Sequence, residues 1–205
     1  MSVNRMLALL IAMVALVSIV VQFTLNARVP GLETWLPRLL DMTRAFTYLT
    51  TALIVLHMTA VWLDWPVARN LSAALTLAVV LVGTVYWALL APATPIQGLA
   101  WYPNIGMHLL VPVLTALWWL RFAPKDLRLR DVFLWLIWPL VYCIYALIRG
   151  QITGIYPYFF IDVGQFGWLI VIRNILGLVV AFGLAGLVQW AAGRLAQRVL
   201  ARRVG

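Results

Sequence analysis

The chain has 205 residues, of which 65% are hydrophobic and 10% are charged, and its formal net charge is +9. Soluble domains carry roughly 25% charged residues, so this composition excludes an ordinary soluble protein and indicates an integral membrane protein. The positive charge is expected of loops that face the cytoplasm and anionic lipid head groups, so it does not predict a nucleic-acid partner.

Apolar runs of about 17–25 residues are long enough to cross a bilayer as helices. The sequence contains six, at Met6–Phe23, Phe46–Trp65, Leu71–Ala91, Ile105–Phe122, Val132–Ile148 and Phe166–Ala192. The first is longer than the apolar part of a signal peptide and lacks a small-x-small cleavage site, so we expect a retained helix. The connections are short. The predicted fold is therefore one all-α domain over residues 1–205, a polytopic bundle of six transmembrane helices.

Basic residues near helix ends predict the orientation, because Lys and Arg are retained on the cytoplasmic side. Ten lie on the side of the N-terminus, namely Arg5, Arg69, Arg121, Lys125, Arg128, Arg130, Arg194, Arg198, Arg202 and Arg203. Four lie on the other side, at Arg28, Arg38, Arg44 and Arg149. Both termini are therefore predicted to be cytoplasmic, with residues 193–205 forming a basic tail.

The sequence has few of the motifs that bind cofactors or metals. Neither a Gly-rich phosphate loop nor a Cys/His zinc spacing is present, and Cys143 is the only cysteine. His57 and His108 belong to different helices and, at ~1.5 Å per residue, to different depths, so they are not expected to share a metal ion. We expect neither a cofactor nor a metal. His57 has the character of a helix-packing histidine bonded to a neighbouring helix.

Polar residues collect at the outer ends of the predicted helices. Thr50 lies ~9 Å inside Arg44, and His108 enters the next-but-one helix at nearly the same level. The other candidates for a substrate or oxyanion pocket at this end are Asn104, Tyr86, Tyr156, Tyr158, Asp162, Arg173 and Asn174. A threonine hydroxyl becomes a nucleophile when a neutral histidine accepts its proton. Thr50 and His108 are therefore candidate catalytic residues.

Alternatives remain open for several of these residues. The run "TYLTTALIVLHMT" offers Thr47, Thr51 and Thr59 beside Thr50, and threonines in membrane helices commonly bond to the preceding turn. Asp162 is a possible ion-pair partner of Arg173, with Arg149 as its competitor. Pro112 and Pro139 are expected to kink their helices. Gly106 is expected to allow close approach of a partner helix or a substrate.

Three short motifs, "YLT" with Thr50, "NIGMH" followed by "VP", and "GIYPYFFID", resemble in this order the androgen-induced membrane threonine hydrolases, which cleave fatty acid esters of hydroxy fatty acids. The stretch "WPLVYCIYALIRGQITGIYPYFFIDV" is similar to their bacterial six-helix relatives. The resemblance implies a catalytic threonine and histidine at Thr50 and His108. The stretch "TALIVL" after Thr50 departs from the polar, acidic surroundings of the family's threonine.

The resulting hypothesis is a threonine-dependent intramembrane hydrolase of lipid esters in a bacterial inner membrane, with its site in the outer, periplasmic half. Its partners would be a fatty-acid ester substrate and membrane lipids. Two other functions remain open. The same pocket suits a non-enzymatic protein that binds or transports a lipid or small acid. The small-residue face "GLVVAFGLAG" of the last helix suits a structural subunit of a larger membrane complex.

Overall fold

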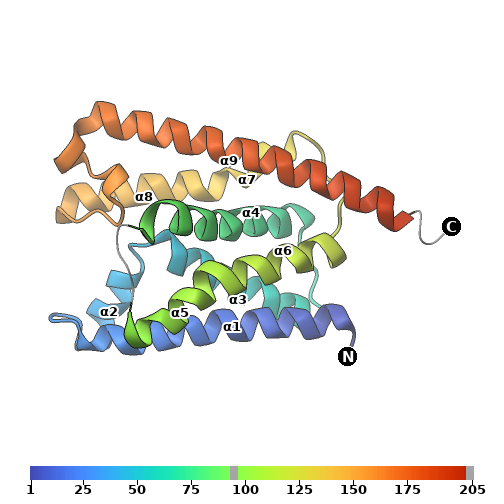
Figure 1. Cartoon of the computed structure of the whole chain (residues 1–205), viewed down its shortest axis with the longest axis horizontal. Coiled ribbons are helices and arrows are strands. Elements are labelled where there is room, and N and C mark those ends of the chain that lie inside the picture. The colour runs from blue at the N-terminus through green and yellow to red at the C-terminus, as the bar shows by residue number, and fades with distance from the viewer. Residues whose placement is uncertain (93–96, 202–205) are drawn as a thin grey trace.

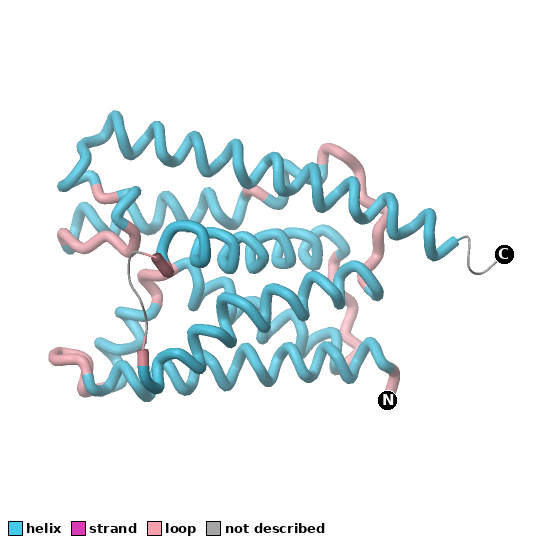
Figure 2. Tube along the Cα trace, in the orientation of Figure 1, coloured by secondary structure: helices cyan, strands magenta, loops and turns pink. Residues whose placement is uncertain are grey.

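The computed structural model of the chain describes residues 1–92 and 97–201, and every regular element in this part is a helix. Figure 2 shows these helices joined by short loops. The predicted all-α class is therefore confirmed for the described residues. Five helical segments are long and apolar enough to cross a membrane, or six if a bent pair counts as one span.

The five segments contain most of the predicted runs and extend beyond them, by seven residues at Gly98 and by nine at Ala201. They consist of α1 (Val3–Leu25) with η1 (Asn26–Arg28); α4 (Arg69–Val85) with η2 (Tyr86–Leu90); η3 (Gly98–Ala100), α5 (Trp101–Ile105), η4 (Gly106–Leu110) and α6 (Val111–Phe122); α7 (Asp131–Trp135) with α8 (Ile137–Thr153); and α9 (Val163–Ala201). The turn η5 (Phe159–Ile161) lies between α8 and α9. The elements η2 and η4 are π-helical turns.

The bent pair consists of α2 (Trp35–Met42) and α3 (Phe46–Trp62), whose axes differ by 95°. The sequence analysis treated residues 26–38 as a connection and therefore missed α2. Most of its apolar side chains are exposed, among them Trp35, Leu36 and Leu40, while Met42 is buried. A short helix of this kind, at a right angle to a span, is suited to lie along the membrane surface.

Both termini lie at the same end of the bundle in Figure 1, which we call the terminal end. At the opposite end, which we call the α2 end, α2 packs beside α1 and η1. Helix α4 runs through the middle of the bundle, with α8 and α9 on one side and α1 and α6 on the other (Figure 1). Ten of its 17 residues are buried, as expected of a central helix.

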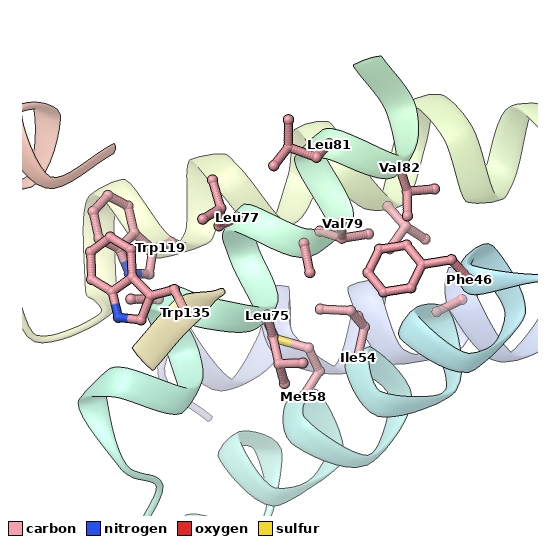
Figure 3. Close-up of a cluster of buried hydrophobic side chains, with 14 of the residues drawn as sticks. Phe46, Ile54, Met58, Leu75, Leu77, Val79, Leu81, Val82, Trp119 and Trp135 are labelled. Carbon is pink, nitrogen blue, oxygen red and sulfur yellow. The ribbon is translucent and has the colours of Figure 1, made fainter. Parts of the chain in front are cut away.

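The apolar core runs along α4 between these layers. Ile54 of α3 points toward Val79 of α4, Met58 lies beside Leu75, and Phe46 closes the core toward one end (Figure 3). Trp119 and Trp135 fill the other end of the view. In a bilayer, where lipid is as apolar as these side chains, such helices are held together by close packing rather than by expulsion of water.

Two glycines allow the helices to approach closely near the α2 end. A Cβ at Gly106 would lie 1.9 Å from Ser18 Oγ of α1, and one at Gly83 would lie 2.7 Å from the backbone oxygen of His108. Either substitution would force the helices apart. The close approach predicted at Gly106 is confirmed, and the neighbour is α1.

A break before Pro139 separates α7 from α8 at Leu136. Proline has no N–H for the carbonyl four residues earlier, which belongs to Trp135, and its ring clashes with that carbonyl. The structure therefore has a break in the helix where the sequence predicts a kink.

The loop between α6 and α7 is packed against α9 at the terminal end. Lys125, the only lysine of the chain, donates hydrogen bonds to the backbone oxygens of Trp119 and Ala123. Trp190 of α9 donates to the backbone oxygen of Leu127 at 3.2 Å. Burial lowers the pKa of Lys125 to about 8.

Residues 193–201 of the predicted basic tail form the last turns of α9, which ends at Ala201. Its Arg194 and Arg198 are exposed on that helix. Arg202 and Arg203 lie outside the described residues.

Candidate active site

His108 lies in the π-helical turn Gly106–Leu110, and Pro112 follows four residues after it. Because Pro112 has no N–H, the backbone oxygen of His108 loses its usual helical partner. Trp87 of the facing π turn, Tyr86–Leu90, supplies a replacement and donates its indole N–H to this oxygen at 3.0 Å. Single π turns occur frequently at functional sites. Two of them meet at His108.

Both ring nitrogens of His108 have partners. Nδ1 lies 3.1 Å from the backbone oxygen of Asn104, and Nε2 lies 3.3 Å from the hydroxyl of Thr47. A carbonyl oxygen only accepts hydrogen bonds, so Nδ1 carries the proton of the neutral ring and Nε2 is an acceptor. This is the tautomer that a general base requires.

An aromatic ring also packs against the face of the His108 imidazole. The ring of Tyr86 stacks on it with centroids 3.8 Å apart and planes 21° apart. Asn104 donates from Nδ2 to the Tyr86 hydroxyl at 2.8 Å, and both residues are buried. The structure therefore brings together three residues predicted for the site: His108, Asn104 and Tyr86.

The threonine that contacts His108 is Thr47, one turn before the predicted Thr50. Thr50 is fully buried, and its hydroxyl accepts a hydrogen bond from the indole N–H of Trp138 at 3.0 Å. The predicted hydrogen-bonded pair of Thr50 and His108 is therefore not the pair in the structure. Residues three apart on a helix point in directions about 60° apart, so their hydroxyls reach different neighbours. Spacing alone left the four threonines of this helix equivalent.

Tyr158 lies beside Thr47 at the start of α3. Its hydroxyl accepts a hydrogen bond from the backbone N–H of Phe46 at 3.0 Å and interacts with the side chains of Thr47 and Tyr142. Burial raises the pKa of Tyr158, so its phenol stays protonated at neutral pH. Tyr142 donates its own proton to the backbone oxygen of Arg44 at 2.5 Å.

The start of α3 is also tied to α8 through the bend after α2. Arg149 donates to the hydroxyls of Thr43 and Tyr145, at 2.7 and 2.6 Å, and to the backbone oxygen of Leu40 at 2.6 Å. A cation suits the carbonyls at the end of a helix such as α2. These contacts hold the bend from which Thr47 projects. The sequence did not predict this role of Arg149, because two of its partners, Thr43 and Leu40, lie more than 100 residues earlier in the chain.

An apolar pocket with a cavity volume of about 80 Å³ adjoins Thr47 and Tyr158. The remaining lining is almost entirely apolar and comes from α3, α4, η2, α8, η5 and α9. One lining residue, Leu140 of α8, is 39% exposed, so the pocket reaches the outer surface of the bundle. Cys143 also lines it.

Of the four other predicted pocket residues, three have local structural partners. Tyr156 packs its ring where a Cβ of Gly150 would lie, and its hydroxyl accepts from Gln151 at 2.7 Å. Asp162 accepts from the backbone N–H of Gln165 at 3.0 Å, near the start of α9. Asn174 donates to the backbone oxygen of Phe160 at 2.9 Å. The fourth residue, Arg173, is exposed on α9.

The ion pair proposed for Asp162 is wrong on these contacts. Within the part of the chain that the structure describes, the ion pairs are Arg44 with Asp41 and Arg69 with Asp126. Asp162 bonds to the first turn of α9, and its predicted competitor Arg149 bonds elsewhere. The carboxylate therefore serves the helix end, where backbone N–H groups lack helical partners.

His57 differs from its predicted role in a similar way. It is buried on α3 with its ring edge-on to Trp118, at a centroid distance of 5.8 Å. Neither ring nitrogen has a hydrogen-bond partner in the described structure. It packs between helices, but the predicted interhelical hydrogen bond is absent there.

Comparison with known proteins found no matching family model, no matching curated protein and no matching solved structure. The functional argument for this chain therefore depends on the geometry of the residues around His108.

Proposed function

We propose that the protein is an intramembrane hydrolase of lipid esters, with a threonine nucleophile on α3 and His108 as the base. One observation carries the proposal. The His108 ring has its Nδ1 proton held by a carbonyl oxygen and presents Nε2 to a threonine hydroxyl at 3.3 Å. A nucleophile beside a base that is itself oriented by a third group is the arrangement of nucleophilic catalysis. On this geometry the nucleophile is Thr47.

The chemistry has two halves. Thr47 Oγ attacks the ester carbonyl carbon, its proton passes to His108 Nε2, and the carbonyl electron pair moves onto oxygen. When that pair returns, the bond to the leaving alcohol breaks and His108 protonates the alcohol. A water molecule then attacks the acyl-threonine while His108 takes its proton. Collapse of the second tetrahedral intermediate releases the carboxylic acid, and His108 returns the proton to Thr47.

The apolar pocket supports a lipid as the substrate. Thr47 and Tyr158 bring the polar atoms of the site to its wall, while the remaining lining suits an aliphatic chain. Exposure of Leu140 on α8 favours entry from the bilayer rather than from water. The ester would thus be presented to Thr47 with its apolar part already buried.

We further propose six spans, with the bent pair of α2 and α3 as one, and both termini in the cytoplasm of a bacterial cell. The concentration of arginines at the terminal end favours this orientation. His108 and Thr47 would then lie in the periplasmic half of the inner membrane, with α2 along the outer surface.

The purified protein should hydrolyse a fatty-acid ester of a hydroxy fatty acid and should react with a fluorophosphonate probe at a residue of α3. Mapping the labelled peptide identifies the nucleophile directly. His108→Gln should abolish both reactions. Labelling that persists unchanged in His108→Gln would refute His108 as the base.

A second candidate function is lipid binding without catalysis, which the pocket supports by itself. Cys143, the only cysteine, allows a binding test that needs no turnover. A fatty acid in the pocket should slow modification of Cys143 by an apolar thiol reagent, with Cys143→Ser as the unlabelled control. Protection without hydrolysis would favour the binder, whereas hydrolysis would favour the enzyme.

A transport path through the bundle has less support than hydrolysis or lipid binding. The terminal half of the bundle is closed by large side chains, since Trp119 and Trp135 are almost fully buried and Lys125 bonds across the end of α6. Transporter sites are typically formed by discontinuous helices near the bilayer midplane. The polar groups around His108 instead lie toward the α2 end.

A further inference from the structure

We infer that Tyr158 is a catalytic residue that donates a hydrogen bond to the oxyanion formed when Thr47 attacks the ester. This inference depends on the proposed hydrolase function, and it names the group that stabilises the charge in the transition state. Acyl transfer needs donors already aimed at the oxygen where negative charge develops.

The first argument is location. Thr47 and Tyr158 both line the apolar pocket, and their side chains interact. When the Thr47 oxygen attacks an ester carbonyl carbon, the carbonyl oxygen is bonded to that same carbon and therefore lies near Thr47. The hydroxyl of Tyr158 is therefore close to the place where the oxyanion forms.

The second argument is that the other donors near Thr47 already have acceptors. Tyr142 donates to the backbone oxygen of Arg44, and Trp138 donates to Thr50. Asn104 donates to Tyr86, and neither of these two residues lines the pocket. Tyr158 accepts the backbone N–H of Phe46, and its hydroxyl interacts with the side chains of Thr47 and Tyr142, so its own proton lies beside the nucleophile. Among the phenols and amides predicted for an oxyanion pocket, Tyr158 is the one that lines the pocket.

The third argument is the state of the phenol. Tyr158 comes from the turn before η5, is stacked on Phe160 with centroids 5.2 Å apart, and is enclosed by Tyr142. Its burial keeps the group neutral. A protonated, immobilised donor needs little reorganisation as the charge develops, which is the property that makes oxyanion donors effective.

The test compares two tyrosine-to-phenylalanine variants from the same loop. Tyr158→Phe removes the proposed donor, whereas Tyr156→Phe removes a hydroxyl that the structure bonds only to Gln151. We expect Tyr158→Phe to lower kcat by roughly 10²–10³-fold, the range for loss of one oxyanion donor, with little change in KM. Tyr156→Phe should stay close to wild type.

A second measurement separates catalysis from structural support. A trifluoromethyl ketone with an aliphatic tail forms a tetrahedral adduct with the nucleophile and so probes the oxyanion. Its inhibition constant should rise in Tyr158→Phe by the same factor as kcat/KM falls. Protection of Cys143 by a fatty acid, which probes the pocket alone, should be unchanged. A merely structural Tyr158 would weaken both kinds of binding together.

The possible failures are distinct. If wild-type protein hydrolyses esters and Tyr158→Phe does so equally well per folded molecule, the role of Tyr158 is refuted while the hydrolase remains. Equal losses in adduct formation and Cys143 protection would also refute it. If wild-type protein neither hydrolyses esters nor reacts with acyl-enzyme probes, the proposed function fails, and the role of Tyr158 fails with it.

Discussion

Replacing Thr47 and Thr50 separately by alanine should produce two different defects. The two residues are ~4.5 Å apart along the same helix, yet their hydroxyls have different partners. Thr47 lies 3.3 Å from His108 Nε2, and Thr50 accepts from Trp138 at 3.0 Å. Thr47→Ala should remove the nucleophile, and Thr50→Ala should remove a structural acceptor.

The magnitudes follow from these contacts. Thr47→Ala loses one hydrogen bond, with a net effect on stability of about 0.5–1.5 kcal/mol. Its hydrolysis should fall by a factor on the order of 10⁴ or more, as expected when a nucleophile is deleted. Thr50→Ala leaves the Trp138 indole N–H without its acceptor next to a fully buried site, which costs about 1–3 kcal/mol of stability. Its activity per folded molecule should remain near wild type.

The assay measures both properties on the same purified samples. Unfolding in a denaturing detergent, followed by tryptophan fluorescence, gives the stability, and ester hydrolysis normalised to folded protein gives the activity. Thr47→Ser and Thr50→Ser keep each hydroxyl and serve as controls that should retain most of both. If Thr50→Ala abolishes hydrolysis per folded molecule while Thr47→Ala retains it, the hydrogen-bonded pair in the structure is not the catalytic pair. The motif-based assignment of Thr50 would then be correct.

Three further predictions concern the rest of the fold. Single cysteines at Glu33 and Arg128, in a cysteine-free background, should react with membrane-impermeant reagents from opposite sides, and reaction of both from one side would refute the orientation. Lys125, as the only lysine, should titrate near 8 in an NMR pH series of the labelled side chain. Because its pKa is lower in the folded than in the unfolded chain, stability should rise between about pH 8 and pH 10.5, and Lys125→Met should remove that rise. A titration near 10.5 would contradict the burial argument. Gly150→Ala would place a Cβ 2.2 Å from the Tyr156 ring and should destabilise the protein by about 1–3 kcal/mol, whereas an unchanged unfolding midpoint would show that the ring moves freely.

Much of the candidate site was predictable by residue type and depth. The approximate depths of His108 and Asn104 follow from the rise of a helix, and the polar residues at the outer ends stand out against an apolar background. The choice among threonines was not predictable, because Thr47, Thr50 and Thr51 all lie within about one turn. Thr51 has no hydrogen-bond partner in the described structure, Thr50 bonds to Trp138, and Thr47 faces the histidine. Small differences in direction around the helix decide these contacts.

Composition and the length of the apolar runs determined that this is an all-helical chain built to cross a membrane, because a helix alone satisfies its backbone hydrogen bonds in lipid. They also located the prolines whose missing N–H groups break α7 from α8 and free the carbonyl of His108. Only the tertiary structure decided which side chains meet. The Arg149 contacts that hold the bend between α2 and α3, and the approach of Tyr158 to the start of α3, join segments more than 100 residues apart. Such contacts depend on the direction in which each helix face points after packing, and a linear apolar pattern carries no information about that direction.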